Sequence, residues 1–376
     1  MNSLWLKVIT FIGVFLYFPV LGQAKYQNPE VKILIFSTHS NFSLSSPTGI
    51  VLQASGQRLG NKLQVSFLGN KRLQVGRLAP GTAVIRLSSL SPILVKHGGH
   101  KTRRYRGDMV LVPYKKGVYL VNYIQTESYL EGVLAGEIKT TWPIEAVKAQ
   151  AVIARTYALY RRFERRNALW HLVSGTGDQV YLGVDADDPK GRLAISATRG
   201  VVVSYKGRLA QTFYHTNCGG MTEDPGVLWD FSLPYYHVVE VPFGEEDPIY
   251  NWEFFLSSHQ ALTLLRKFGF SSPGITGISV LKRTESGRAY WVQFNQSGQK
   301  TVLAKDFRRL VGYTKIKSLM FDIIPVQKGF LVRGQGNGHG VGLCQWAAKE
   351  MATKGYSYQD ILHFFYRPVD LGYYDG

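Results

Sequence analysis

Residues 127–159 read ESYLEGVLAGEIKTTWPIEAVKAQAVIARTYAL, and this stretch constrains the fold more than any other part of the chain. Apolar residues recur every three or four positions on both sides of a short break, which predicts two helices. The first helix is predicted to begin with Thr126 as N-cap and to stop at Gly136, where glycine allows a left-handed backbone. The second is predicted to begin near residues 141–143, because proline is tolerated in a first turn. Glu137 is therefore expected in the gap between the helices.

The second predicted helix has a row of mostly small side chains, which would allow close packing against a neighbouring element. The row consists of Ile144, Val147, Ala151, Ala154 and Ala158. The same stretch contains three basic residues, which are expected to surround the gap with positive charge: Lys139, Lys148 and Arg155. A loop glutamate is usually only a solvated charge, so a catalytic role for Glu137 needs further support.

The residue pattern of the stretch supplies that support. It reads E-x-Y-L-x-G-V from Glu127, then G-E ending at Glu137, then W-P-x-E-A-x-K-A-Q-A-V-x-A-R-T-Y-A from Trp142. This pattern resembles the family of stage II sporulation protein D (SpoIID) and the amidase enhancer LytB. Three later segments resemble the same family: DQVYLG at 178–183, FYHTNCGGMTE at 213–223 and GQGNGHGVGLCQWA at 334–347.

The resemblance implies a lytic transglycosylase that cleaves peptidoglycan glycan strands at the MurNAc–GlcNAc bond. In that reaction one carboxylic acid protonates the glycosidic oxygen, and the resulting carboxylate takes a proton from the C6 hydroxyl of the sugar, forming a 1,6-anhydro ring. Glu137 would be the single acid/base, and no cofactor is expected. The candidate substrate-binding residues are Lys148, Arg155, Gln179, Tyr181, Tyr214, His215, Asn217, His339 and Gln345.

Other functions stay open from the sequence. A hydrolytic glycosidase would need a second carboxylate, for which Asp178 and Glu223 are candidates. A non-catalytic relative would bind glycan and present it to an N-acetylmuramoyl-L-alanine amidase, which would then be its partner. An envelope structural protein would explain the charge but not the motifs. Peptide or ester cleavage is disfavoured, because the chain has neither H-E-x-x-H nor G-x-S-x-G.

Glycine occupies every second position from 334 to 342. The spacing does not fit G-x-G-x-x-G, and no Lys-Ser/Thr follows as in a P-loop, so phosphate binding is not indicated. The glycines instead predict a backbone that comes very close to something, either substrate or another strand.

The two cysteines, Cys218 and Cys344, lie in the segments that also contain His215 and His339. A disulfide between the cysteines is one interpretation, and a Cys₂His₂ metal site is another. The spacing does not match a recognised zinc finger, so no metal is expected. Some members of the resembled family bind zinc just before the Q-x-Y element, but residues 167–178 contain His171 and no cysteine, which disfavours that site here.

Residues 1–24 contain Lys7 as their only charged residue and an apolar run from about Val8 to Val20. They predict a signal peptide cleaved after Ala24, with an uncleaved anchor as the alternative, and export to the periplasm or cell envelope. The net charge is +18, and removal of Lys7 would leave +17. For an exported protein this charge favours anionic envelope polymers over nucleic acid as partners.

The remainder of the chain predicts an α+β fold. Short β-branched segments predict a small β-rich N-terminal domain over residues 25–100, and a SpoIID-like catalytic domain of mixed helices and strands would follow over 101–376. Within the second domain we expect a helix over 257–268, strands over 277–283, 289–294 and 329–333, and a helix capped by Ser357 and Asp360.

Overall fold

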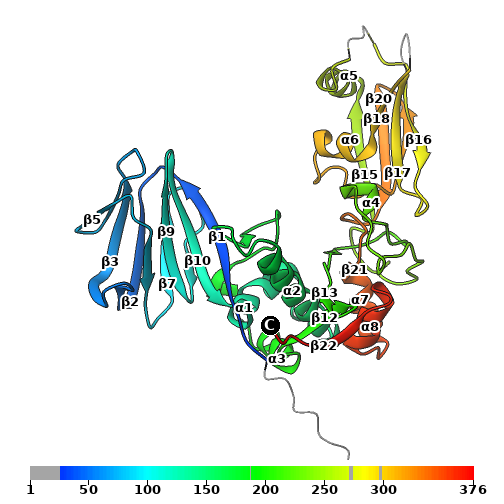
Figure 1. The fold of residues 1–376 in the computed structure, drawn as a ribbon. Coiled ribbons are helices and arrows are strands. Elements are labelled where there is room, and N and C mark those ends of the chain that lie inside the picture. Colours follow the sequence, from blue (N-terminus) through cyan, green and yellow to red (C-terminus); the bar gives the residue numbers. More distant parts are fainter. Residues whose placement is uncertain (1–25, 187, 271–273, 296–298) are drawn as a thin grey trace, which may run out of the picture.

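The computed structural model describes residues 26–186, 188–270, 274–295 and 299–376. The expected signal peptide and its cleavage site lie outside these residues. Helices and strands are mixed along the chain, which confirms the α+β class. Figure 1 shows two arms joined by a helical middle: a large N-terminal sheet on one side and an upright lobe on the other. In the described residues no helix has both the length and the apolar character that a membrane span requires.

The N-terminal arm is an 11-stranded sheet with the order β11-β1-β10-β9-β6-β2-β3-β4-β5, to which β7 and β8 are attached through β2. In β6 and β7 alternate side chains are buried, as expected for strands with one face on the core, whereas β9 and β10 are buried on both faces. β1 pairs with β10 along almost its whole length. The expected domain boundary between residues 100 and 101 therefore does not coincide with a break in the sheet. The strands are β1 (Glu30–Thr38), β2 (Phe42–Leu52), β3 (Gln57–Phe67), β4 (Leu73–Val75), β5 (Leu78–Gly81), β6 (Ile85–Ser88), β7 (Ile93–His97), β8 (Arg103–Tyr105), β9 (Asp108–Tyr114), β10 (Gly117–Gln125) and β11 (Leu172–Val173).

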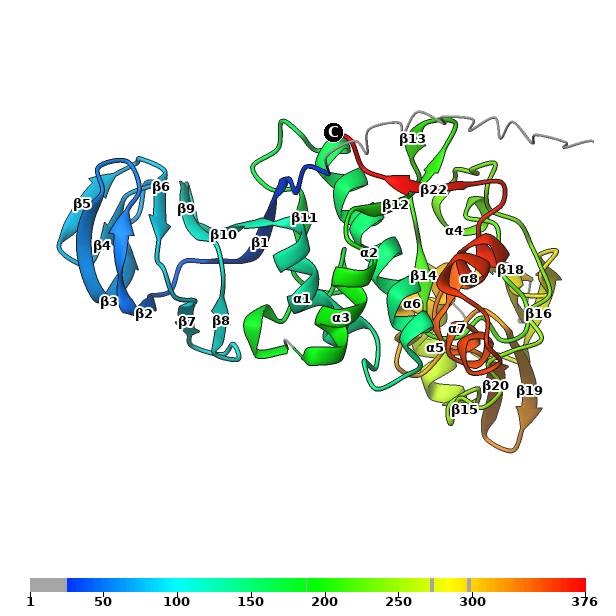
Figure 2. The same cartoon turned by 90° about the horizontal axis from the view of Figure 1, so that it is seen from below.

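The helical middle contains α1 (Thr126–Glu137), α2 (Ile144–Glu164), η1 (Gly183–Ala186) and α3 (Pro189–Ala197). The predicted small-residue row of α2 packs toward α1 and the sheet, while Ala146, Ala149 and Ile153 face a second core. Because α2 is buried on both sides, it lies in the centre of the molecule, as the view from below shows (Figure 2).

Two details of α1 differ from the sequence prediction. The helix includes Glu137, and Gly136 is not left-handed. A Cβ on Gly136 would lie 2.6 Å from the carbonyl oxygen of Val180, so the glycine allows a neighbouring segment to pack closely. Thr126 does not cap the helix; its hydroxyl donates to the carbonyl oxygen of Pro29, 2.7 Å away.

The second core forms around short strands and the C-terminal helices. β14 (Tyr214–His215) and β21 (Leu343–Cys344) pair in parallel, and this pairing brings two motif segments together that are far apart in sequence. Ser357 and Asp360 form the predicted capping box. The other elements of this region are β12 (Val201–Tyr205), β13 (Arg208–Leu209), α4 (Gly226–Trp229), α7 (Gln345–Thr353), α8 (Tyr358–Phe365) and β22 (Asp370–Tyr373).

The upright lobe has its own hydrophobic core, built by two three-stranded sheets and two helices. The sequence predicted one of the helices and three of the strands within two residues. The elements are β15 (Asn251–Ser257), α5 (Ser258–Lys267), β16 (Gly277–Arg283), β17 (Ala289–Asn295), β18 (Lys300–Leu303), α6 (Ala304–Val311), β19 (Phe321–Val326) and β20 (Gly329–Gln335).

The glycines of 334–342 approach protein, not open space. Gly336, Gly338, Gly340 and Gly342 all have positive φ. A Cβ on Gly338 would lie 2.7 Å from the Cβ of His215, and one on Gly342 would lie 2.2 Å from the carbonyl oxygen of Phe213. Of the two alternatives left by the sequence, the structure supports the neighbouring strand.

We expect Gly340→Ala to destabilise the protein by roughly 2–4 kcal/mol, because it combines a strained backbone with a steric clash. Gly340 has a φ of +87°, and its added Cβ would meet the Arg288 guanidinium at 2.3 Å. Gly355→Ala is the matched control, since Gly355 has a φ of +90° and no neighbour within 4 Å. Denaturant unfolding should therefore show a larger loss for Gly340→Ala; equal losses would mean that the Arg288 contact is unimportant.

Candidate active-site cleft

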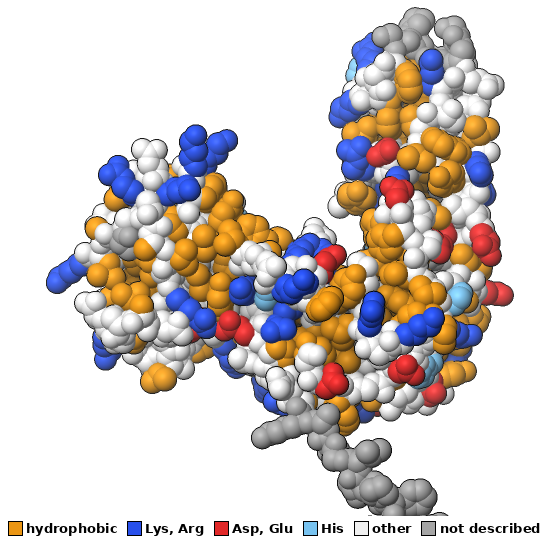
Figure 3. All heavy atoms as spheres, viewed as in Figure 1, with side chains coloured by type: hydrophobic (Ala, Val, Ile, Leu, Met, Phe, Trp, Pro, Cys, Tyr) orange, Lys and Arg blue, Asp and Glu red, His pale blue; other side chains and the backbone are white. Residues whose placement is uncertain are grey.

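A cleft of about 1020 Å³ lies where the helical middle meets the base of the lobe. One wall contains Glu137 at the end of α1 and the strand residues Tyr214 and His215, and the other contains residues of α6. In the space-filling view the two arms of the molecule flank an open hollow with basic side chains at its floor (Figure 3). An extended ligand can therefore reach the base of the lobe from solvent.

Glu137 is half-buried in the wall of this cleft. Its carboxylate accepts hydrogen bonds from the backbone N–H of Val180 and from the hydroxyl of Tyr214. Its backbone is fixed as well, because the side-chain amide of Gln345 donates to the Glu137 carbonyl oxygen at 2.8 Å. Glu137 is thus held by three separate segments of the chain, and its side chain has little freedom.

A buried chain of hydrogen bonds positions Tyr214 in turn. The amide of Gln179 donates to the Tyr214 hydroxyl at 3.3 Å, and the Tyr129 hydroxyl donates to the Gln179 oxygen at 3.1 Å. The expected residues Gln179, Tyr214 and Gln345 are therefore all brought to Glu137. Such second-layer contacts orient a reactive group and keep it in one rotamer.

Burial raises the pKa of Glu137 above its ordinary value, and the hydrogen bonds from Val180 and Tyr214 only partly oppose this shift. The basic residues expected around the gap do not offset it. The ammonium group of Lys139 lies over the ring of Trp346 instead. A carboxyl group with a raised pKa retains its proton at higher pH, which is what a general acid requires.

The other carboxylates that line the cleft, within the described part of the chain, are paired with arginine. Asp178 contacts Arg161 and Arg165, each at 3.1 Å, and Asp306 contacts Arg309 at 3.0 Å. Glu223, the other alternative from the sequence, does not line the cleft; it accepts hydrogen bonds from Thr284 and Ser286. Among these carboxylates, only Glu137 combines access to the cleft with the absence of a basic partner.

The wall opposite Glu137 is basic and aromatic. Lys305, Arg308 and Arg309 of α6 line it, together with Tyr313. Trp229 stacks on Phe213 with ring centroids 4.5 Å apart, and 37% of Trp229 remains exposed. Aromatic faces next to hydrogen-bonding groups suit a sugar ring, which has one apolar face. This wall was not predicted from the sequence, because it forms only where α6 and α4 meet the helical middle in the fold.

His215 and His339 line the cleft, with their rings 5.2 Å apart. Burial and the nearby charge of Arg308 lower the pKa of His339 to about 3, and burial also lowers the pKa of His215. Both imidazoles are therefore neutral at physiological pH. The Nδ1 atom of His339 accepts a hydrogen bond from Val341 at 3.1 Å, which fixes the ring at the cleft wall.

Five of the nine expected substrate-binding residues do not line the cleft, and one of them, Gln179, is fully buried and reaches Glu137 only through Tyr214. Arg155 is fully buried and makes an ion pair with Glu127, and Lys148 forms a partly exposed ion pair with Glu145. Two further side chains are buried in structural contacts: the Tyr181 hydroxyl donates to Asn122, and the Asn217 amide donates to the carbonyl oxygen of Gly244. These residues match the family motif, but their side chains make structural contacts and do not face the cleft.

The cysteines Cys218 and Cys344 lie next to each other and are both buried, with free thiols. The structure therefore contains no disulfide between them. Their sulfurs and a ring nitrogen of His215 all lie within 4.8 Å of one another. His339 is not part of this group, so the four-residue metal site considered from the sequence reduces to three residues.

The raised pKa of Glu137 leads to a test on stability alone. Protonated Glu137 favours the folded state, so its contribution is complete below pH 4.5, the ordinary value, and is lost as the pH rises through the folded-state pKa. Glu137→Gln stays neutral at every pH. We expect its stability relative to wild type to rise between these two pKa values and to level off above them, as measured by denaturant unfolding at a series of pH values. A difference that does not change with pH would contradict the raised pKa.

Comparison with known proteins agrees with this architecture. Residues 114–205 match the stage II sporulation protein family (SpoIID), and residues 240–342, which contain most of the lobe, match a domain of unknown function, DUF8618. An uncharacterized protein of Brachyspira hyodysenteriae is 33% identical over 268 residues, which cover 71% of this chain and 72% of that protein.

Two relatives have functional names. The amidase enhancer of Bacillus subtilis is 28% identical over 294 residues, covering 65% of this chain but only 40% of that longer protein. Stage II sporulation protein D of the same organism is 25% identical over 306 residues, covering 77% of this chain and 87% of that protein. On this evidence the chain belongs to the SpoIID/LytB family.

Proposed function

We propose that this protein is a lytic transglycosylase that cleaves peptidoglycan glycan strands and uses Glu137 as its only acid/base. The observation that supports this best is the state of Glu137: it lines the cleft, its pKa is raised by burial, and it has no basic partner. Family membership makes a cell-wall substrate the natural choice.

The proposed reaction has two proton transfers and no water. Protonated Glu137 gives its proton to the glycosidic oxygen, so that the bond from C1 of MurNAc to this oxygen breaks. The Glu137 carboxylate then accepts the proton of the C6 hydroxyl while the C6 oxygen bonds to C1. This transfer regenerates the acid form of Glu137. The hydrogen bonds from Val180 and Tyr214 to the carboxylate, and the one from Gln345 to the Glu137 carbonyl oxygen, keep the acid in one place through both steps.

A reaction with one carboxylate fits this cleft better than hydrolysis. An inverting or retaining glycosidase needs a second acidic group on the other side of the sugar. Asp178 has two arginine partners and a hydrogen bond from Tyr157, which leaves it poorly placed to activate water. The second candidate, Glu223, lies outside the cleft.

The two walls suggest how a strand is held. Trp229 would stack against the apolar face of a sugar, and the basic residues of α6 would face the lactyl carboxylates or other acidic groups of the strand. This positive wall, together with the net charge of +18, is consistent with export to an envelope rich in anionic polymers. We include the signal peptide, with cleavage after Ala24, in this proposal.

A second function is favoured by one specific observation, the similarity to an amidase enhancer. In that case the same cleft would bind glycan without cutting it, and an amidase would act on the bound strand. The test is to incubate the protein, expressed from Lys25 onward, with purified peptidoglycan, alone and with an N-acetylmuramoyl-L-alanine amidase, and to follow soluble products by mass spectrometry. Our proposal expects soluble glycan fragments from the protein alone. If products appear only with the amidase, the enhancer function replaces it.

A further inference from the structure

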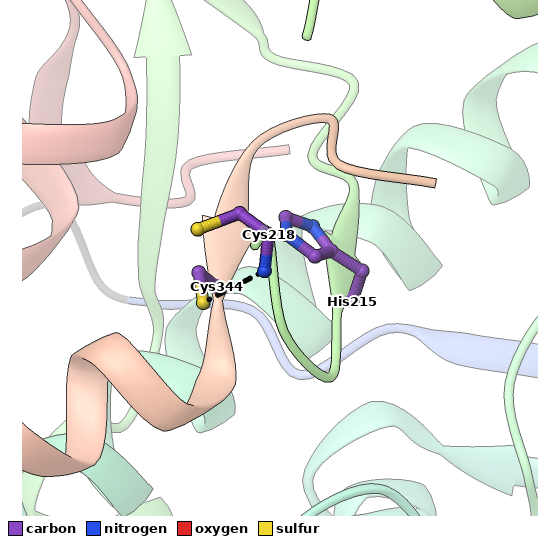
Figure 4. Close-up of side chains that lie close together, drawn as sticks. All are labelled: His215, Cys218 and Cys344. Atoms are coloured by element: carbon purple, nitrogen blue, oxygen red, sulfur yellow. Dashed lines mark hydrogen bonds between the residues drawn. The ribbon is translucent and has the colours of Figure 1, made fainter. Parts of the chain in front are cut away.

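The group formed by His215, Cys218 and Cys344 extends inward from the cleft wall, where His215 lines the cleft and the two cysteines do not. All three residues are buried: the cysteines are fully covered and His215 is 5% exposed. They come from β14, from the turn after it and from β21. Figure 4 shows the imidazole ring extending toward the two cysteines.

The His215 ring has one nitrogen in use and one without a partner. Nδ1 lies 3.1 Å from the carbonyl oxygen of Val341, to which a protonated Nδ1 can donate. This arrangement leaves Nε2 with a free lone pair, and Nε2 is buried without a hydrogen bond. An unpartnered buried nitrogen is costly, and a metal ligand has this same arrangement: one ring nitrogen bonded to a carbonyl, the other directed at the ion.

Hydrogen-bonding and charged groups lie close to the two sulfurs. The backbone N–H of Cys218 donates to the Cys344 sulfur at 3.3 Å, and Cys344 stands at the N-terminus of α7. The guanidinium of Arg288 bonds to the Cys218 carbonyl oxygen, and Glu223 is the nearby carboxylate. Two thiolates would neutralise the charge of a divalent ion, and the opposite charges of Arg288 and Glu223 would balance each other.

We propose that His215, Cys218 and Cys344 bind one thiophilic d¹⁰ cation, Zn²⁺ or Cu⁺. Two thiolates and one imidazole are ligands that both ions accept. In a tetrahedral zinc site the ligand atoms lie about 3.5–3.8 Å apart, so this group, now within 4.8 Å, has to contract by about an ångström. The ion would fasten β14 to β21, and these two strands carry Tyr214 and precede Gln345, which both hold Glu137.

A disulfide between the cysteines is the competing interpretation. It would satisfy the sulfurs, but it would leave Nε2 of His215 buried and unpartnered. A metal ion satisfies all three groups at once, and this difference decides between the two interpretations.

The test measures metal retained by the reduced protein after gel filtration, with Zn²⁺ and Cu⁺ supplied in separate samples. The expected result is one equivalent of at least one ion per chain. Co²⁺ should in addition give a thiolate charge-transfer absorption band. Cys218→Ser, Cys344→Ser and His215→Gln should each weaken binding by at least 100-fold, whereas His259→Ala, which alters an exposed histidine of the lobe, should bind as wild type does.

The melting temperature separates ligation from simple packing. A chelator should lower the melting temperature of the wild type and of His259→Ala but not that of the two serine variants, even if those variants are less stable throughout. The proposal is overturned if reduced wild type retains neither ion, if a serine variant retains as much as wild type, or if the exported protein is two hydrogens lighter because the cysteines are paired.

Discussion

Arg155→Met should destabilise the protein by about 3–5 kcal/mol, because it leaves Glu127 as an unpaired buried charge. The guanidinium makes two bonds to the Glu127 carboxylate, both at 2.8 Å, and a further bond to the carbonyl oxygen of Val201 at 3.1 Å. Burial alone would raise the pKa of Glu127, but the bonds and charge of Arg155 hold it below its usual value. Denaturant unfolding measures the loss directly.

Lys148→Met is the matched control, since Lys148 also forms an ion pair, with Glu145, but both side chains are partly exposed to solvent. Its loss should be no more than about 1 kcal/mol. The double variant Glu127→Gln/Arg155→Met removes both buried charges and should be more stable than Arg155→Met alone. If Arg155→Met unfolds as wild type does and only glycan binding falls, Arg155 is a substrate ligand and the structural role is wrong.

Glu137→Gln should reduce glycan cleavage at least about 100-fold, the usual effect of losing a general acid/base. Glutamine keeps the size of the side chain and can still contact Val180 and Tyr214, but it has no proton to transfer. Binding to insoluble peptidoglycan should persist, as measured by co-sedimentation. Glu253→Gln, an identical change at an exposed residue of the lobe, should leave cleavage unchanged.

The elements that the sequence predicted well are those specified by local signals. The capping box of Ser357 and the apolar spacing around Val147 act within one or two turns, so they are visible in the chain itself. The break between the two helices was also predictable, but the sequence placed Glu137 within it, whereas α1 extends through Glu137. The residue at which α1 ends depends on the segment around Val180, which is distant in sequence and packs against Gly136.

The composition of the cleft could be predicted only in part. Motif resemblance identified Glu137, Gln179, Tyr214 and Gln345, which the fold brings together. Resemblance does not say whether a motif residue faces the cleft or the core, and Arg155 faces the core. The wall of α6 was not predicted because its position depends on how the lobe packs against the helical middle. Short-range sequence patterns do not indicate that packing.

The most direct test of the central claim is to digest purified glycan strands in ¹⁸O-labelled water with wild type and with Glu137→Gln, and to weigh the new ends by mass spectrometry. Our account predicts wild-type fragments that end in 1,6-anhydro-MurNAc, one water lighter than reducing ends and free of ¹⁸O, and almost no fragments from Glu137→Gln. Reducing ends that contain ¹⁸O would show that water is the nucleophile, and equal cutting by Glu137→Gln would show that another group is the acid.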